Sequence, residues 1–329
     1  MTEIPDASPA VDIDALFVAL RPKLHRYCAR MVGSVIDGED VLQDALIKAV
    51  EAFAAIKALS SEVDTGSRQE NASSKESRAP FRFDRNGKGS GPIGNPEGWL
   101  FRIAHNTALD FLRKRNRQEA LYSRDEVDMM ADQLDAVTSR QIAAASLRIF
   151  MRLNVTQRSS VILMDVLGYS LAEICAVMDV SLAAAKAALV RGRAQLRKYA
   201  DEPDDAPQPA LSEADRKRLG AYVALFNARD FDAIRAMIAD DVRLDLVSKT
   251  RLNGKAEVSR YFGNYSKVSD WHLVPGLVEG QPAILVFDPN QPGSKPKYFM
   301  LLNWSADKVA TIRDFRHAPY IIDGAEYLV

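Results

Sequence analysis

Two separated stretches of this chain have the pattern of a helix that carries a cluster of cations. Residues 99–117 keep an apolar stripe at helical spacing and end with four cations among five residues, Arg113 to Arg117. Residues 153–198 have the pattern of helix, turn and helix, and the last helix holds five cations and no acid. The formal net charge of the chain is only −1. Positive charge is therefore gathered locally, which indicates that a polyanion is held at two places.

Composition limits the other classes of protein. At 329 residues, the chain has room for two or three domains, each with its own core. Its two cysteines, Cys28 and Cys175, fall on apolar helix stripes, and with four histidines they offer no zinc spacing. The first residues have neither a basic start nor a long apolar run. We therefore predict a cytoplasmic protein with no membrane span, disulfide, metal or cofactor.

The first third of the sequence predicts a helical domain at residues 12–117. Helices are expected at 16–31 and at about 40–59, where apolar residues recur at helical spacing. Residues 57–94 lose this periodicity and are rich in Ser, Gly and charge, which indicates a flexible insertion. Asn95, Pro96 and Glu97 then provide a cap, a first-turn proline and a first-turn acid for the next helix.

A linker is predicted at 118–138, followed by a second helical domain at 139–200. Its helices are expected through Leu147 and Phe150, from Thr156 to about Gly168, at 171–178 after a capping box at Ser170, and at 182–199. Three prolines among acids mark a second linker at 201–210. Residues 211–329 then give two helices followed by strands at 242–247, 283–287, 298–304 and 309–315, the pattern of an α+β domain.

Each charged segment also has a purely structural interpretation. The cations at the end of helix 99–117 would complement the helix dipole, and so would the acids at the start of helix 40–59. The helix-turn-helix could be an ordinary hairpin in a bundle. These alternatives stay open when each segment is taken alone.

Together, residues 14–200 resemble a bacterial extracytoplasmic-function (ECF) RNA polymerase sigma factor. Residues 37–45 (DGEDVLQDA) are similar to the family's region 2.2, residues 95–113 to regions 2.3 and 2.4, and residues 153–158 with 168–174 to region 4. The resemblance implies that region 2.2 docks on the polymerase β′ subunit, that regions 2.3 and 2.4 melt and read the −10 element, and that region 4 binds the −35 element. The implied partners are the core polymerase, through its β′ and β subunits, and promoter DNA.

Three sets of residues follow from this resemblance. Those expected to contact −10 DNA are Arg102, Asn106, Arg113, Lys114, Arg115 and Arg117. Those expected to contact −35 DNA are Lys186, Arg191, Arg193 and Arg197, on a helix whose alanine-rich start, 183–188, predicts little direct reading of bases. Those expected to contact polymerase are Asp37, Glu39, Asp40, Gln43 and Asp44.

The C-terminal residues 211–329 resemble a SnoaL-like domain of the nuclear-transport-factor-2 (NTF2) superfamily, a cone of curved sheet and helices around a pocket. The matching residues are the opening helix, residues 240–245 and the closing strands through residues 312–317. Candidate pocket residues are Asp245, Trp304, Arg313, Asp314 and His317. Some enzymes of this superfamily move protons with Asp and His. A small-molecule ligand, a structural role and catalysis are the alternatives for this domain.

The predicted fold class is mainly α, with a region 2 helical bundle and a region 4 helix-turn-helix followed by an α+β cone. The predicted function is that of a non-enzymatic sigma factor whose C-terminal domain regulates it. The alternatives are a ligand-responsive DNA-binding regulator that does not associate with core polymerase, and an isomerase or cyclase with an accessory helical region.

Overall fold

The computed structural model of the chain describes residues 13–63, 95–119, 147–200, 209–291 and 293–329. The chain divides into two compact units. An N-terminal unit contains residues 1–33 and 37–200, and a C-terminal unit contains residues 34–36 and 201–329. Each unit has its own core and is considered by itself.

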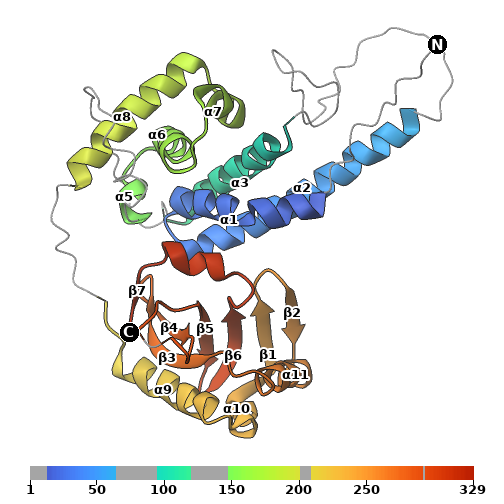
Figure 1. Cartoon of the computed structure of the whole chain (residues 1–329), viewed down its shortest axis with the longest axis vertical. Helices are drawn as coiled ribbons and strands as arrows, with labels where there is room; N and C mark the ends of the chain where they lie inside the picture. The colour runs from blue at the N-terminus through green and yellow to red at the C-terminus, as the bar shows by residue number, and fades with distance from the viewer. Residues whose placement is uncertain (1–12, 64–94, 120–146, 201–208, 292) are drawn as a thin grey trace. The chain divides into compact units, whose positions relative to one another are not determined.

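The N-terminal unit is helical throughout its described part (Figure 1). Its helices are α1 (Ile13–Val32), α2 (Val35–Val63), α3 (Pro96–Glu119), α5 (Leu147–Met151), α6 (Val155–Val161), the π-helix η1 (Ile162–Val166), α7 (Leu171–Met178) and α8 (Leu182–Ala200). The helix α1 packs on α3, α5 and α6, and α7 packs on α3 and α8. Buried residues on both sides of the 120–146 segment, such as Tyr27, Trp99, Phe150 and Ile174, form one continuous hydrophobic core.

Local capping chemistry explains where several of these helices begin. The Asn95 side chain accepts a hydrogen bond from the Gly98 backbone N–H at 2.9 Å, which confirms the predicted start of α3. Ser170 and Glu173 form the predicted capping box of α7. The start of α6 differs by one residue from the prediction, because the side chain of Asn154 caps it by accepting from the Gln157 N–H. This helix then continues as the π-helix η1 and ends at Val166.

The helix α2 is longer than predicted at both ends. It begins at Val35 instead of Asp40 because Gly38 lets it cross α1 closely: a Cβ at Gly38 would lie 2.6 Å from the backbone of Ala29. It continues to Val63, so residues 57–63 of the predicted insertion are helical. The rest of that insertion lies outside the described residues, as do residues 120–138 of the first predicted linker and 201–208 of the second.

The C-terminal unit is a seven-stranded sheet with α9, α10 and α11 gathered on one side and the short helix η2 on the opposite side (Figure 1). Its helices are α9 (Glu213–Asn227), α10 (Phe231–Met237), α11 (Lys255–Tyr265) and the 3-10 helix η2 (Pro319–Gly324). Its strands are β1 (Ile238–Leu246), β2 (Thr250–Asn253), β3 (His272–Val278), β4 (Gln281–Phe287), β5 (Tyr298–Ser305), β6 (Lys308–Asp314) and β7 (Tyr327–Leu328), in the order β2-β1-β6-β5-β4-β3-β7. Only the β1–β6 pair is parallel among these strands.

The predicted fold class is confirmed: helices fill the N-terminal unit, and an α+β unit follows. Strands β1, β4, β5 and β6 were expected, and so was the β5–β6 hairpin, where Ser305 pairs with Lys308. The helix α11 and the strands β2, β3 and β7 were not predicted. No helix in the described ranges is long and apolar enough to cross a membrane.

The crossing of α1 and α2 yields a test of the packing. We expect Gly38→Ala to lower the free energy of unfolding by about 2 kcal/mol, because the added methyl group must push the two backbones apart. The matched control is Gly220→Ala in α9, where nothing lies within 4 Å of the added Cβ. The control should leave stability unchanged or raise it by up to ~1 kcal/mol through helix propensity. Urea unfolding followed by circular dichroism measures both, and an equal effect of the two substitutions would contradict the packing argument.

Candidate nucleic-acid and polymerase interface

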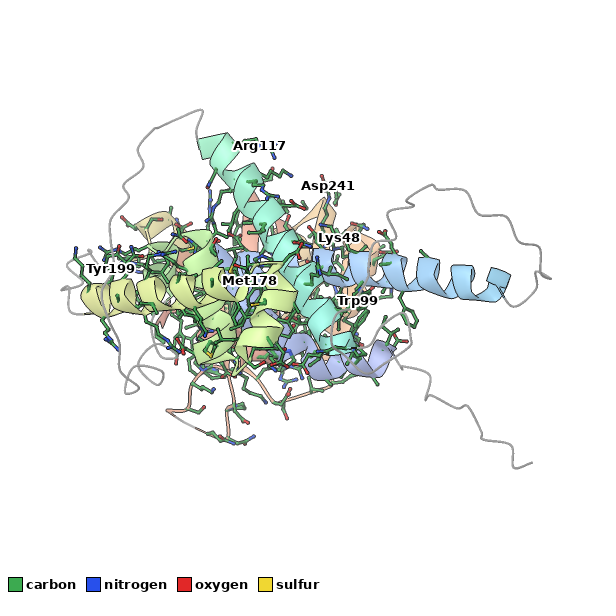
Figure 2. All side chains as sticks on the ribbon, turned by 90° about the horizontal axis from the view of Figure 1, so that it is seen from above. Lys48, Trp99, Arg117, Met178, Tyr199 and Asp241 are labelled. Carbon is green, nitrogen blue, oxygen red and sulfur yellow. The ribbon has the colours of Figure 1, made fainter. Side chains whose placement is uncertain are left out.

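The helix α3 presents most of its predicted −10 contacts to solvent. Asn106 is exposed at mid-helix, and Arg113, Lys114 and Arg117 are exposed along the last turns. Figure 2 shows α3 running from Trp99, which is buried in the core, to Arg117 at the helix end. An amide followed by cations at helical spacing can contact a base edge and the phosphates next to it.

Two of the predicted −10 residues have partners outside α3, whereas Arg113 pairs with Asp110 and Arg117 donates to the Arg113 carbonyl oxygen within the helix. The Arg115 guanidinium donates to the Val32 carbonyl oxygen at the end of α1, at 2.9 Å, and lies 4.0 Å from the Asp37 carboxylate. The Arg102 guanidinium lies 3.3 Å from the carboxylate of Asp179, in the turn between α7 and α8. The side chains of Arg102 and Arg115 are each only about a quarter exposed to solvent, because the rest of each contacts other parts of the protein.

The helix α8 is the second helix of the helix-turn-helix. Its inner face, which includes Ala185, Ala188 and Leu189, is buried and packs on α6 and α7. The turn needs a left-handed residue, and Asp179 provides it with φ 57°. The small side chains of Ala185 and Ala188 let α8 pack closely on its neighbours. These two alanines belong to the segment that we expected to make little direct contact with bases, and they also stabilise the fold.

The cations of α8 differ in their surroundings. Lys186 and Arg191 are exposed, and Arg197 is half-buried. Arg193 instead pairs with the buried carboxylate of Asp165 in η1, with 2.8 Å between Nε and Oδ2, and this pairing raises the pKa of Arg193. A buried acid requires such a partner. The structure therefore gives Arg193 a role in the fold that the sequence prediction did not include.

Most of the predicted polymerase-docking residues reach solvent, but one is buried in an ion pair. Asp44 is exposed on α2, while Asp37, Asp40 and Gln43 are partly exposed. Glu39 differs from the prediction, because it is completely buried and paired with Arg21 of α1. Beyond Asp44, the apolar side chains of Ile47 and Val50 are half exposed. Between residues 37 and 50, the exposed side of α2 thus has a short acidic face, with Lys48 beside it, that continues into two apolar residues.

The helix α6 is joined to α1 and α3 by a buried polar network. The Arg158 guanidinium of α6 is 4% exposed and donates to the carbonyl oxygens of Phe150 at 2.9 Å and Leu153 at 2.8 Å, and also to that of Met31 in α1. The hydroxyl of Tyr27 lies 2.7 Å from both Ser159 Oγ and His105 Nδ1. These bonds connect α1, α3 and α6 in the interior.

A second polar contact joins α7 to the start of α3. The Tyr169 hydroxyl, just before α7, donates to the Glu97 carboxylate, which also lies 2.6 Å from Lys23 Nζ. The Lys23 ammonium lies over the Tyr169 ring at 4.3 Å from its centroid. The lysine and the tyrosine hydroxyl lower the pKa of Glu97 against the effect of burial. The helix-turn-helix therefore packs against α3 through charged and aromatic groups as well as apolar ones.

The candidate pocket residues of the C-terminal unit do not form one cluster, although Asp245 and Arg313 lie within ion-pair distance of each other. Asp245 in β1 lies near Arg251 and Arg313 of the neighbouring strands, at 3.5 and 3.6 Å. Asp314 is completely buried, so it points to the side of β6 opposite Arg313. His317 lies after the end of β6 and is exposed. The Arg218 guanidinium carbon lies over the indole of Trp304, 5.9 Å from the ring centroid.

The sequence analysis missed a set of tyrosines around Asp314. The hydroxyls of Tyr261 and Tyr265, both in α11, donate to its carboxylate at 2.8 Å. The Tyr298 hydroxyl lies 3.1 Å from that of Tyr265 and accepts from Arg316 at 2.7 Å. Burial raises the pKa of Asp314. The signal in the sequence was the i, i+4 spacing of two tyrosines within 255–265, a segment that was not assigned to a helix.

Comparison with known proteins places the helical segments in a family context. The model for sigma-70, region 4 matches residues 147–196. The ECF RNA polymerase sigma factor SigG of Mycobacterium tuberculosis is 24% identical over 334 residues, which cover 92% of this chain and 81% of SigG. The ECF RNA polymerase sigma factor SigM of the same organism is 29% identical over 183 residues, covering 56% of this chain and 74% of SigM.

Solved structures of two kinds align with the chain. The crystal structure of the M. tuberculosis ECF sigma factor SigJ is 19% identical and covers 92% of this chain and 95% of SigJ, with a TM-score of 0.31. An NTF2-like protein of unknown function from Cytophaga hutchinsonii is 18% identical and covers 30% of this chain and 95% of its own, with a TM-score of 0.23.

The buried position of His105 predicts a pH-dependent stability. Burial, with Arg102 and Arg113 nearby, lowers the pKa of His105 from 6.5 to about 4, so the folded chain keeps a neutral imidazole whose Nδ1 lies 2.7 Å from the Tyr27 hydroxyl. The unfolded chain takes up a proton below pH 6.5, and the folded chain only near pH 4. The contribution of neutral His105 to the free energy of unfolding is therefore complete above pH 6.5. It is lost as the pH falls toward 4, at up to about 1.4 kcal/mol per pH unit.

We expect urea unfolding between pH 7 and pH 5 to show this loss in the wild type. His105→Gln should make the pH dependence less steep, because the amide accepts a hydrogen bond and does not titrate. His272→Gln, at an exposed position in β3, is the control. If the wild type and His105→Gln lose stability in parallel over this range, the burial argument is wrong.

Proposed function

We propose that this chain, a homologue of the ECF RNA polymerase sigma factors, binds core polymerase and directs it to promoters. The region 4 match and the homologous sigma factors support this function, which the sequence predicted. They also indicate a regulator that is not an enzyme. The observation that carries the residue-level proposal is that one helical unit exposes carboxylates on α2 and cations on both α3 and α8.

Core polymerase would dock on the acidic face of α2. Asp40, Gln43 and Asp44 follow one another at helical spacing, and Ile47 and Val50 continue the same side of the helix with exposed apolar groups. A basic amphipathic helix of the β′ subunit would complement both the charge and the apolar end. Glu39 would support this face from inside by its ion pair with Arg21.

Promoter DNA would be bound at two places. On α3, Asn106 would contact an unstacked base of the −10 element, with Arg113, Lys114 and Arg117 on the neighbouring phosphates. On α8, Lys186 and Arg191 would bind phosphates of the −35 element with the helix in the major groove. Arg102, Arg115 and Arg193 would chiefly orient these helices, because each has a partner on another element of the fold.

Binding both elements at once would require the helix-turn-helix to leave α3. The two elements lie ~25 base pairs apart by their names, which is about 85 Å of B-form DNA at ~3.4 Å per base pair. In the structure, Arg102 of α3 and Asp179 of the α7–α8 turn lie 3.3 Å apart. The polar contacts at Arg158, Tyr27 and Glu97 would therefore have to open, or be replaced, when promoter and polymerase are bound.

The C-terminal unit would regulate the helical unit to which it is tethered. The connecting residues 201–205 include four acids, which could compete with phosphate for the cations of α8. The described residues include no hydrogen bond between His317 and either Asp245 or Asp314, so we propose that this unit takes a small-molecule ligand without turning it over.

In vitro transcription with purified core polymerase tests the proposed function. We expect the wild-type chain to start transcription from a genomic promoter fragment. The double variant Asp40→Lys/Asp44→Lys should lose most of this activity, because a basic partner helix would now be repelled. The matched control is Asp240→Lys/Asp241→Lys, which makes the same change in net charge on the C-terminal unit.

Co-purification with core polymerase separates the outcomes of this test. Loss of both association and transcription in the α2 variant, but not in the control, is the expected result. A wild-type chain that binds the promoter fragment without any association with core polymerase would instead identify a free-standing DNA-binding regulator.

Run-off transcription with a chain that ends at Asp201 tests the regulatory role. We expect its promoter output to differ from that of the full chain at least about threefold, because the acidic tether and the C-terminal unit are removed. A mixture of the shortened chain with a separate 209–329 fragment is the control for the covalent link. Identical output from the full and shortened chains at all polymerase concentrations would refute regulation by this unit.

A further inference from the structure

Six cations of the helical unit gather where α5 packs on both α1 and α8. They come from these three helices and from the residue that follows α5, and they are Arg26, Arg30, Arg148, Arg152, Arg197 and Lys198. We call them the seam cations, because α1 lies in the predicted region 2 domain whereas α5 and α8 lie in region 4. All are exposed except the half-buried Arg30 and Arg197.

Two aromatic rings connect the seam cations of neighbouring helices. The Arg30 guanidinium carbon of α1 lies over the Phe150 ring of α5, 5.7 Å from the ring centroid. The Arg152 guanidinium carbon, just after α5, lies over the Tyr199 ring of α8 at 3.6 Å from its centroid. Burial, together with the charge of Arg26, lowers the pKa of Arg30 to about 10. These contacts bring cations of all three helices to neighbouring positions.

Carboxylates are scarce in the helices that carry this set. The sequences of α1, α5 and α8 contain one acid between them, Asp14, which lies about 18 Å before Arg26 along the axis of α1. Glu39 and Asp165, on the neighbouring α2 and η1, are held in ion pairs with arginines outside the set. The seam cations therefore form a strong local excess of positive charge, which attracts a polyanion.

The make-up of the set favours a chain of phosphates without bases. Five of the six residues are arginines, whose planar guanidinium groups bind pairs of phosphate oxygens. A chain of repeated charges can reach cations on all three helices, whereas a single phosphate cannot. The bases of single-stranded nucleic acid stack on open aromatic faces. Here Phe150 is 0% exposed, and the Arg152 guanidinium covers a face of the Tyr199 ring.

We propose that the seam cations bind inorganic polyphosphate, a linear polyanion, across α1, α5 and α8. Because the ligand contacts helices of both domains at once, it favours the arrangement in which the helix-turn-helix packs on the first helices. The two ends of α8 then serve different anions, since Lys186 lies about 18 Å along the helix axis from Lys198. This site goes beyond the proposed promoter contacts, which use the early part of α8 and the exposed side of α3.

Isothermal titration calorimetry of the purified full chain tests the site. The probes are inorganic polyphosphate of about 25 phosphates and oligo(dT) with the same number of phosphates. The seam variant Arg26→Gln/Arg148→Gln/Lys198→Gln removes one exposed cation from each helix. We expect it to bind polyphosphate at least about tenfold more weakly than the wild type at ~0.15 M salt, because three phosphate contacts are lost. Its binding of oligo(dT) should change less than about twofold.

The matched control is Lys114→Gln/Lys186→Gln/Arg191→Gln, which removes the same charge from exposed cations proposed to bind the promoter. It should change the binding of polyphosphate less than about threefold. Amide hydrogen exchange then tests whether one ligand spans the seam. Polyphosphate should slow exchange in the last turns of α1 as well as in α5.

Four results would overturn the proposal. Polyphosphate that does not bind at millimolar phosphate rules the site out, and an equal loss in the seam variant and the control assigns polyphosphate to the promoter-binding cations. A seam variant that loses oligo(dT) as strongly as polyphosphate makes the seam a nucleic-acid site. Protection of α5 and α8 without α1 shows that the ligand does not join the two domains. Because polymerase and promoter are absent from these measurements, their failure is distinct from failure of the transcription assay.

Discussion

One buried cation, Arg158, is central to the packing of the helical unit, and it has no acidic partner among the described residues. The guanidinium of Arg158 replaces its lost hydration with carbonyl oxygens at the ends of α1 and α5 and just beyond them. Carbonyls at a helix end carry partial negative charge and lack partners within their own helix, so they suit a buried cation. The burial lowers the pKa of Arg158 to about 10, which still leaves the group charged at neutral pH. This single side chain fixes α6, and with it the helix-turn-helix, against the first helix of the chain.

The contacts of Arg158 are also of a kind that can be exchanged. Backbone carbonyl oxygens at a helix end can be hydrated when α6 moves away, and no buried acid is left behind. The Tyr27–His105–Ser159 bonds and the Glu97–Tyr169 bond are likewise polar. A proposed transition between packed and promoter-bound arrangements would thus exchange hydrogen bonds between protein groups for hydrogen bonds to water, at a modest net cost for each.

The sequence predicted those elements whose signals are local. The caps at Asn95 and Ser170 and the helical spacing of apolar residues located α1, α3, α7 and α8 to within a few residues. The early start of α2 could not be predicted, because Gly38 reads as a helix breaker until its contact with Ala29 is known. In the C-terminal unit, β2 could not be predicted because it has only four residues, is mostly exposed and contains no apolar run. The strand β3 could not be predicted because Pro275 and Gly276, which are unfavourable in strands, lie in its middle.

The candidate site shows the same division between local and long-range information. Exposed residues such as Lys114 and Arg191 lie in cation clusters that charge and helical spacing identified, while the role expected of Asn106 came from the family resemblance. Glu39 and Arg193 were assigned to surfaces because their ion-pair partners, Arg21 and Asp165, lie 18 and 28 residues away along the chain. The tyrosines around Asp314 were missed for a related reason: they come from α11 and β5, and only the folded sheet brings them to β6.

The pairing of Arg193 with Asp165 has a consequence for ionic strength. A cation that is neutralised inside the protein displaces few sodium or potassium ions when a duplex is bound. Counterion release scales with the number of phosphates that are neutralised. Each such contact makes the slope of log K against log salt concentration steeper by ~0.9. If α8 binds promoter DNA as proposed, its affinity would therefore depend less on salt than its five cations suggest, because Arg193 is already paired with Asp165.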